Sequence, residues 1–207
     1  MPRFDAILFD FDGVLLDSEP LHCACWAEVL APFGVTLEWE VYCERYLGMD
    51  DREMIRQIAA EAARPLQWEA LFAQYPNKKK LFQARMEKPP FPAGVADLLD
   101  RLKREYRLAV VSSSARDEIE PPLVRAGLRQ HFGVLVTGGD TPRHKPAPDP
   151  YLRAAALLGA RTPLVVEDSP AGIASGQAAG FEVLAVQNAA DMPRLLAERL
   201  SGGLAAG

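Results

Sequence analysis

Short runs of apolar residues, rich in Val, Leu and Ile, recur along the chain, and each is followed by polar or glycine-rich residues and then by a helical pattern. Such runs are typical of strands buried on both faces of a parallel sheet. They predict five strands, at residues 6–9, 108–111, 134–137, 164–166 and 183–186. From the second run onward the spacing is about 20 to 30 residues, which accommodates a strand, a crossover helix and two loops. The pattern therefore predicts an α/β fold with a parallel sheet.

The first gap breaks this rhythm, because roughly 100 residues separate the first run from the second. Much of this span is helical in pattern, with apolar residues at i, i+3, i+4 and i+7 in Trp26, Val29, Leu30 and Phe33. A helix start is predicted near Ser18, and the proline-rich segment 88–92 cannot continue a helix. We therefore predict a core formed by residues 1–16 and 89–207, with an inserted helical cap at 17–88.

Composition narrows the classes of protein that remain. The 207 residues are 49% apolar and 25% charged, which is typical of a globular chain of one domain with a smaller inserted one. Because 23 basic residues face 28 acidic ones, the net charge is −5, which argues against a nucleic-acid partner. No apolar run approaches the roughly 18 residues of a membrane span, and Asp5 and Asp10 come too early for a secretory signal. A cytoplasmic monomer without a membrane partner is expected.

Cysteines and histidines do not form a recognisable metal or disulfide pattern. The three cysteines include no CxxC pair, and the three histidines are far apart in sequence: Cys23, Cys25 and Cys43; His22, His131 and His144. Neither a disulfide framework nor a zinc site is predicted, and the cysteines are expected to be unpaired.

Two acidic pairs follow predicted strands. Asp10 and Asp12 come after the first strand, where a period of two sends both side chains to one side, and Glu167 and Asp168 come directly after the strand at 164–166. Carboxyl ends of parallel strands share one edge of the sheet, so the two pairs are expected to converge on one ion. Oxygen ligands alone suit a hard divalent cation, and we predict Mg²⁺. The alternatives are turn or capping carboxylates, or acids that favour a helix N-terminus.

Groups suited to an anion lie between the acidic pairs. Ser112, Ser113 and Ser114 follow the second strand, and Lys145 lies in a proline-rich loop. Hydroxyl and backbone N–H groups can hold phosphoryl oxygens, while a lysine neutralises their charge. Taken singly, a serine run is usually a turn and a lysine usually faces solvent. Their position at strand ends favours a phosphate site.

The loops after two strands also predict how the next helices begin. Asp149 before Pro150 and Ser169 before Pro170 each place a capping oxygen ahead of a first-turn proline. Further on, glycines recur every four residues, and we expect this face of the helix to pack closely on the sheet: Gly172, Gly176 and Gly180.

Four motifs together resemble the haloacid dehalogenase-like superfamily, specifically its phosphatase and β-phosphoglucomutase branch with a helical cap inserted after the first strand. The motifs are Asp10-Phe11-Asp12-Gly13-Val14, Val110-Val111-Ser112-Ser113-Ser114, Lys145-Pro146-Ala147-Pro148-Asp149 and Glu167-Asp168-Ser169-Pro170-Ala171-Gly172. The resemblance covers nearly the whole chain and implies a Rossmann-like core. It implies that Asp10 is the nucleophile, forming an aspartyl phosphate, and that Asp12 is the general acid and base. The dehalogenases of the superfamily lack a carboxylate equivalent to Asp12, so carbon–halogen cleavage is not expected.

The resemblance also implies a metal and a phosphate site. Mg²⁺ would be held by Asp10, the main-chain carbonyl of Asp12 and Asp168, with Glu167 at or near the coordination shell. Ser112 and Lys145 would hold the phosphoryl oxygens. These roles fit the reading of the residues themselves, because a metal and a lysine withdraw charge from the phosphoryl group and make a carboxylate a competent nucleophile.

The sequence of the predicted cap, residues 17–88, gives fewer indications of function than that of the core. His22 corresponds to a cap histidine of mutase-like members, and Arg52 is a candidate substrate-facing arginine, although acids surround it in Gly48-Met49-Asp50-Asp51-Arg52. The run 78–80 of three lysines either supplies a phosphate-binding lysine or forms a solvated helix face. We predict an Mg²⁺-dependent phosphatase acting on a small phosphorylated metabolite. The alternatives are a β-phosphoglucomutase and, in another class, a non-enzymatic phospho-acceptor of the receiver type.

Overall fold

The computed structural model describes residues 3–46, 49, 51–62, 64 and 66–201. The chain divides into two compact units, which we describe separately. The core unit comprises Met1–Asp17 and Pro89–Gly207, and the cap unit comprises Ser18–Lys88. The prediction from the sequence divides the chain one residue earlier, after residue 16. The roles predicted for the two segments, a catalytic core and a cap, stay predictions.

The core unit contains one sheet of five parallel strands in the order β3-β2-β1-β4-β5. The strands are β1 (Ala6–Phe9), β2 (Arg107–Val111), β3 (Val134–Val136), β4 (Pro163–Glu167) and β5 (Glu182–Ala185). In this register, Phe9 lies between Val110 of β2 and Val166 of β4. Each predicted strand is present with ends displaced by no more than one residue, and the α/β, Rossmann-like fold is confirmed.

Burial on both faces explains why these runs form strands. Every residue of β1 and β4 is buried. On one face, Leu8, Val111 and Val165 belong to a hydrophobic cluster with Tyr151 and Ala154 of the helix α8 (Asp149–Leu158). Burial of each large aliphatic side chain contributes about 1.5–3 kcal/mol. The sheet is therefore a well-supported platform for the loops at its carboxyl edge.

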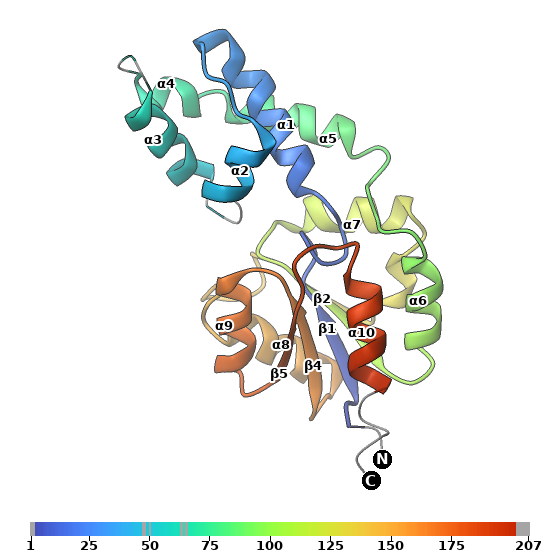
Figure 1. The fold of residues 1–207 in the computed structure, drawn as a ribbon. Helices are drawn as coiled ribbons and strands as arrows, with labels where there is room; N and C mark the ends of the chain where they lie inside the picture. Colours follow the sequence, from blue (N-terminus) through green and yellow to red (C-terminus); the bar gives the residue numbers. More distant parts are fainter. Residues whose placement is uncertain (1–2, 47–48, 50, 63, 65, 202–207) are drawn as a thin grey trace. The chain divides into compact units, whose positions relative to one another are not determined.

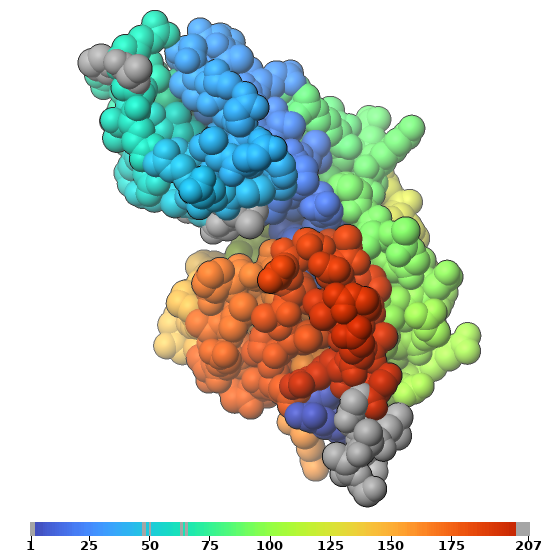
Figure 2. All heavy atoms as spheres, in the orientation of Figure 1, coloured from blue at the N-terminus to red at the C-terminus, as the bar shows by residue number. Residues whose placement is uncertain are grey.

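Helices cover both faces of this sheet, with α8 and α9 on one side and α6 and α10 on the other (Figure 1). The core helices are α6 (Val95–Leu102), α7 (Arg116–Arg125), α8 (Asp149–Leu158), α9 (Pro170–Ala178) and α10 (Met192–Ser201), with a short 3₁₀ turn η2 (Arg129–His131). The segments α9, β5 and α10 share one continuous face of the core unit (Figure 2).

The N-caps of helices α8 and α9 differ from each other. Ser169 caps α9 as predicted, since its Oγ accepts a hydrogen bond of 3.0 Å from the backbone N–H of Gly172. The predicted cap at Asp149 is wrong: α8 begins at Asp149 itself, and Pro148 holds the N-cap position. The Asp149 carboxylate instead accepts from Nε of Arg143, at 3.0 Å. The loop arginine thus takes the place of the backbone donor.

Two of the three predicted packing glycines make the expected close approach. A Cβ at Gly176 would lie 2.8 Å from Cγ2 of Val183, and one at Gly172 would overlap the carboxylate of Glu167. Gly180 lies beyond the end of α9 with φ of +76° and nothing within 4 Å of a Cβ. It allows the chain to turn after the helix, so the packing prediction is wrong for this residue.

The cap unit is helical around its own hydrophobic cluster. It contains α1 (Glu19–Leu30), η1 (Ala31–Phe33), α2 (Trp39–Arg45), α3 (Asp51–Glu61), α4 (Trp68–Phe72) and α5 (Tyr75–Arg85). Trp26, Leu30 and Ile55 are fully buried in this cluster, and Phe33 packs against it. The three cysteines of the chain are free thiols, as predicted. Among the described residues, no helix combines the length and apolar character of a membrane span.

Candidate active site

Asp10 is positioned by the first strand. It follows directly after β1, its backbone N–H donates to the carbonyl of Val166 at 2.9 Å, and only 7% of the residue is exposed. Within the sheet, β2 lies next to β1 on one side, and β4, which comes later in the chain, lies next to β1 on the other side. Open α/β sheets bind ligands at the carboxyl edge where the strand order reverses in this way. Asp10 therefore lies at the point of the fold best suited to a ligand.

The loop after β1 turns sharply at Gly13. This residue has φ of +74°, and its N–H donates to the carbonyl of Leu16 at 2.7 Å. Glycine adopts such a conformation without the steric penalty that other residues meet. A Cβ here would lie 1.9 Å from Oδ2 of Asp168. The absence of a side chain at position 13 therefore leaves room for the Asp168 carboxylate.

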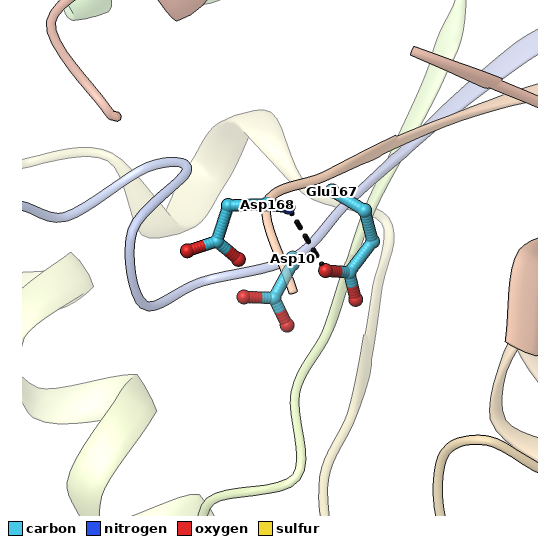
Figure 3. A group of neighbouring side chains, drawn as sticks. All are labelled: Asp10, Glu167 and Asp168. Carbon is cyan, nitrogen blue, oxygen red and sulfur yellow. Dashed lines mark hydrogen bonds between the residues drawn. The ribbon is translucent and has the colours of Figure 1, made fainter. Parts of the chain in front are cut away.

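Three carboxyl groups from two strand ends lie side by side. Asp10, Glu167 and Asp168 each offer one oxygen, and these oxygens lie within 4.8 Å of one another (Figure 3). Acids about 157 residues apart in sequence thus become neighbours, because β1 and β4 are adjacent and parallel. Such a set of hard oxygen donors fits Mg²⁺.

Lys145 connects two of these acids. Its Nζ lies 2.5 Å from Oδ1 of Asp10 and 2.6 Å from Oε1 of Glu167, and it donates to the carbonyl of Val111 at 2.9 Å. The side chain is only 5% exposed. With all three acids ionised, three carboxylates and one ammonium carry a formal charge of two negative in a largely buried space, which a divalent cation would balance. The site is therefore suited electrostatically to such an ion.

Burial and neighbouring charges change the protonation of this cluster. Burial raises the pKa of Asp10 well above its ordinary value; Lys145 opposes this effect, whereas Glu167 and Asp168 add to it. Burial alone would lower the pKa of Lys145, but the carboxylates of Asp10 and Glu167 outweigh it and raise that pKa above its ordinary value. The lysine is therefore a permanent cation, and Asp10 needs further positive charge to remain ionised.

The loop that carries Lys145 is held by its own turn and by α9. The backbone N–H of Ala147 donates to the carbonyl of His144 at 2.8 Å, and the hydroxyl of Ser175 donates to the carbonyl of Ala147 at 2.6 Å. Helix α9 in turn packs against β4 and β5. These hydrogen bonds connect the loop of Lys145 to α9 and, through α9, to the sheet.

Asp12 accepts a hydrogen bond from the loop that follows β2. It is not a member of the three-acid cluster, and its Oδ2 accepts from the hydroxyl of Ser114 at 3.2 Å. Because β1 ends before either aspartate, a strand period does not apply to them, and the predicted alignment of Asp12 with Asp10 stays a prediction. Ser112 is buried and accepts from the backbone N–H of Ser114 at 3.1 Å, whereas Ser113 is exposed.

In the cap unit, the first lysine of the three-lysine run is buried. Lys78 is 3% exposed, and its Nζ lies 3.0 Å from Oδ2 of Asp51 and 2.8 Å from Nδ1 of His22. An ammonium only donates hydrogen bonds, so Nδ1 of His22 accepts and the ring proton is assigned to Nε2. Trp26 donates to the other oxygen of Asp51 at 2.7 Å. The interpretation of this run as a solvated helix face is therefore wrong for Lys78.

Arg52 lies on the surface of the cap unit. It is exposed, and its guanidinium carbon lies 5.0 Å from the ring centroid of Phe72, a cation–π contact. Gly48 and Asp50, which the sequence analysis placed beside it, lie outside the described residues. The substrate roles suggested for His22 and Arg52 stay predictions.

One residue of the core site escaped the sequence analysis. Tyr151 is fully buried, and its hydroxyl donates to Oε1 of Glu167 at 2.7 Å. The signal that could have found it is its place in the first turn of α8, six residues after Lys145, on a helix that must pack its apolar face against the sheet.

Comparisons with known proteins identify the family of the chain. A model of the haloacid dehalogenase-like hydrolase family matches residues 7–186. Fructose-1-phosphate phosphatase YqaB of Escherichia coli is 29% identical over 188 residues, which cover 89% of this chain and 97% of that protein. The phosphorylated carbohydrates phosphatase of Thermotoga maritima is 30% identical over 183 residues, covering 86% of this chain and 82% of that protein.

A solved structure shows the same fold. A conserved haloacid dehalogenase-like protein of unknown function from Agrobacterium tumefaciens has a TM-score of 0.81 and 28% identity, covering 95% of this chain and 99% of that one. A parallel sheet with acidic groups and a lysine at its carboxyl edge defines an α/β protein with a charged site at that edge. Within that class, the chain belongs to the haloacid dehalogenase-like hydrolase family. Both the predicted family and the prediction of an enzyme are confirmed.

Proposed function

We propose that this protein is an Mg²⁺-dependent phosphatase that hydrolyses a small phosphate monoester, a sugar phosphate or related metabolite, through an aspartyl phosphate on Asp10. The observation that carries the proposal is the buried Lys145 ammonium held between the carboxylates of Asp10 and Glu167, beside Asp168. The names of two relatives described above state that they are phosphatases of phosphorylated sugars, which supports the substrate class.

Asp10 and Asp12 would share the chemical work. A carboxylate oxygen of Asp10 attacks phosphorus, the bond between phosphorus and the ester oxygen breaks, and Asp12 gives its proton to the leaving alkoxide. Asp12 then takes a proton from water, whose oxygen attacks phosphorus and releases inorganic phosphate from Asp10. The hydrogen bond from the Ser114 hydroxyl to Oδ2 of Asp12 would help to orient this carboxyl group.

The metal would be held by Asp10 and Asp168, with the main-chain carbonyl of Asp12 as a further ligand and Glu167 nearby. When bound, Mg²⁺ supplies positive charge that polarises the phosphoryl group and offsets the negative charge of the attacking carboxylate. Lys145 and Ser112 would bind phosphoryl oxygens on the other side. A divalent cation would balance the formal charge of two negative in the cluster of Asp10, Glu167, Asp168 and Lys145.

The cap favours hydrolysis over the phosphoryl transfer of a mutase. A mutase retains a doubly phosphorylated intermediate and therefore needs cationic groups for a second phosphate. In the cap unit, Lys78 is buried in an ion pair with Asp51 and a hydrogen bond to His22, and Arg52 lies over the ring of Phe72. Hydrolysis asks only that one water reach the aspartyl phosphate.

A screen of phosphorylated metabolites with Mg²⁺, measuring released inorganic phosphate, tests the proposal. The Asp10→Asn variant, purified in the same way, is the control for contaminating phosphatases. Glucose 1-phosphate with a bisphosphate activator separates the mutase alternative, since isomerisation without release of phosphate would overturn hydrolysis. A receiver-type protein would become phosphorylated but would not turn over an aryl phosphate repeatedly.

A further inference from the structure

Tyr151 lies in the first turn of α8 and is fully buried in the cluster that joins α8 to the sheet. Its hydroxyl donates to Oε1 of Glu167 at 2.7 Å, and the ammonium of Lys145 lies 5.1 Å from the centroid of its ring. A phenol hydroxyl that faces a carboxylate donates its proton to the hydrogen bond, so Tyr151 is a donor to Glu167.

Glu167, the acceptor of this hydrogen bond, accepts from five donors. Its Oε1 accepts from Lys145 at 2.6 Å and from Tyr151 at 2.7 Å. Its Oε2 accepts from the backbone N–H groups of Asp168 and Ser169, at 3.0 and 3.2 Å, and from the Ser169 hydroxyl at 3.1 Å. A carboxylate offers about four lone-pair positions, so these five donors occupy its capacity. Glu167 is fixed by the protein itself.

Lys145 also has its donors fully assigned. An ammonium has three protons, and they face Asp10, Glu167 and the carbonyl of Val111. The position of the ammonium between the two acids depends on how strongly each attracts it. If Oε1 of Glu167 lost its second donor, Lys145 would be its only partner, and the ammonium would be drawn away from Asp10.

We propose that Tyr151 is a positioning residue of this site, whose hydroxyl donates to Oε1 of Glu167 so that the Lys145 ammonium stays beside Asp10, where its positive charge favours a bound phosphoryl group. The inference rests on the proposed function. Tyr151 acts through Glu167 and Lys145 and makes no contact with substrate. It therefore affects phosphate binding and turnover through the placement of one charge.

The test is Tyr151→Phe in the full-length, Mg²⁺-loaded protein, which removes the hydroxyl and keeps the buried ring. We expect the Kd for inorganic phosphate, measured by calorimetric titration, to rise about tenfold, and kcat for an aryl phosphate to fall by about the same factor. Tyr42→Phe is a matched control, because the Tyr42 hydroxyl also donates at 2.7 Å to a carboxylate, that of Glu19, in the cap unit. It is expected to leave both values within twofold.

A double-mutant cycle separates positioning from a general loss of stability. In a Lys145→Met background, Tyr151→Phe is expected to have no further effect on the Kd for phosphate, because the charge that it positions is gone. Equal effects in both backgrounds would overturn the proposal. So would wild-type phosphate binding and kcat in Tyr151→Phe. A wild-type protein without phosphatase activity would instead contradict the proposed function.

One further measurement needs no variant, in case Tyr151→Phe does not fold. In the native protein, the Tyr151 hydroxyl proton is expected to give a slowly exchanging NMR signal, since it is buried and bonded to a carboxylate. Rapid exchange with solvent would show that the hydroxyl does not hold Glu167, and the proposal would fail.

Discussion

The Nζ of Lys145 lies 2.5 Å from Oδ1 of Asp10, although 135 residues separate the two in sequence. The contact links the first strand of the sheet to the loop before α8, and the two side chains are only 5% and 11% exposed. A buried ion pair of this kind is sensitive to removal of one partner, because the other charge is left without compensation.

Lys145→Ala is expected to impair both phosphate binding and folding. The variant leaves Asp10 and Glu167 as adjacent buried carboxylates, which should lower the free energy of unfolding by about 3–5 kcal/mol in the absence of metal. Loss of the cation facing the phosphoryl group should lower kcat by about 10²–10³-fold. Urea denaturation and steady-state kinetics measure the two effects. Phosphate affinity and kcat equal to those of the wild type would refute the assigned role.

Asp12→Asn is expected to lower kcat by about 10²–10⁴-fold with little change in the Kd for phosphate. The amide keeps the size of the side chain and can still accept from the hydroxyl of Ser114, but it cannot transfer a proton. With an aryl phosphate, whose leaving group needs little protonation, the second step should become limiting. Rapid-mixing experiments should then reveal a burst of aryl alcohol. Steady turnover at the wild-type rate would rule out Asp12 as the acid and base.

The sheet could be read from the sequence because its signal is local. Runs such as 164–166 are apolar without alternation, and burial on both faces requires that composition. The convergence of Asp10 with Asp168 followed from a topological rule: parallel strands present the same ends at one edge. Asp12 was harder to place because its side chain depends on the turn at Gly13 rather than on a strand period.

Lys78 and Tyr151 show why contact-dependent roles were not predicted. The run of three lysines resembles a solvated surface, yet Lys78 lies at i+3 from Tyr75 and i−4 from Phe82, on the aromatic face of α5. That a lysine is buried there depends on Asp51, from another helix. The role of Tyr151 likewise depends on which acceptor its hydroxyl meets, which only the packed structure specifies.

Gly13→Ala is expected to abolish activity at Mg²⁺ concentrations that are sufficient for the wild type. The new Cβ would overlap Oδ2 of Asp168, at 1.9 Å, and would also strain a backbone with φ of +74°. Gly94→Ala is the matched control, because Gly94 has φ of +77° but nothing within 4 Å of a Cβ. Both variants should lose about 1–2 kcal/mol of stability from the backbone. Only Gly13→Ala should weaken Mg²⁺ binding, measured by calorimetry; equal Mg²⁺ affinities would contradict the steric argument.

Asp140→Asn tests a pH-dependent contribution to the loop after β3. Burial acts to raise the pKa of Asp140, but hydrogen bonds from the hydroxyl and N–H of Thr137, with the charge of Arg116, bring it below its ordinary value. Because the pKa of Asp140 is lower in the folded state, its ionised carboxylate stabilises the fold at pH values above the unfolded pKa of about 3.9. This contribution is lost as the pH falls through the folded pKa. At pH 7 the free energy of unfolding of the wild type should exceed that of the variant by about 1 kcal/mol. Urea denaturation should show this difference shrinking below pH 4; a constant difference would exclude the ionised carboxylate as its cause.

Lys78→Met is expected to destabilise the cap unit selectively. The substitution keeps an unbranched side chain of similar length against the rings of Trp26 and Tyr75 but leaves the Asp51 carboxylate without its cation. Because Asp51 is 29% exposed, water replaces part of the lost interaction, and we expect a loss of about 2 kcal/mol, below the range for a fully buried pair.

Tryptophan fluorescence isolates this effect, since the three tryptophans of the chain, Trp26, Trp39 and Trp68, all lie in the cap unit. In urea, the fluorescence transition of Lys78→Met should shift to lower concentration. Lys80→Met, at an exposed position of the same helix, is the control and should unfold like the wild type. A fluorescence midpoint unchanged in Lys78→Met would mean that the ion pair with Asp51 contributes nothing to the cap. The buried lysine would then be maintained for a reason other than stability.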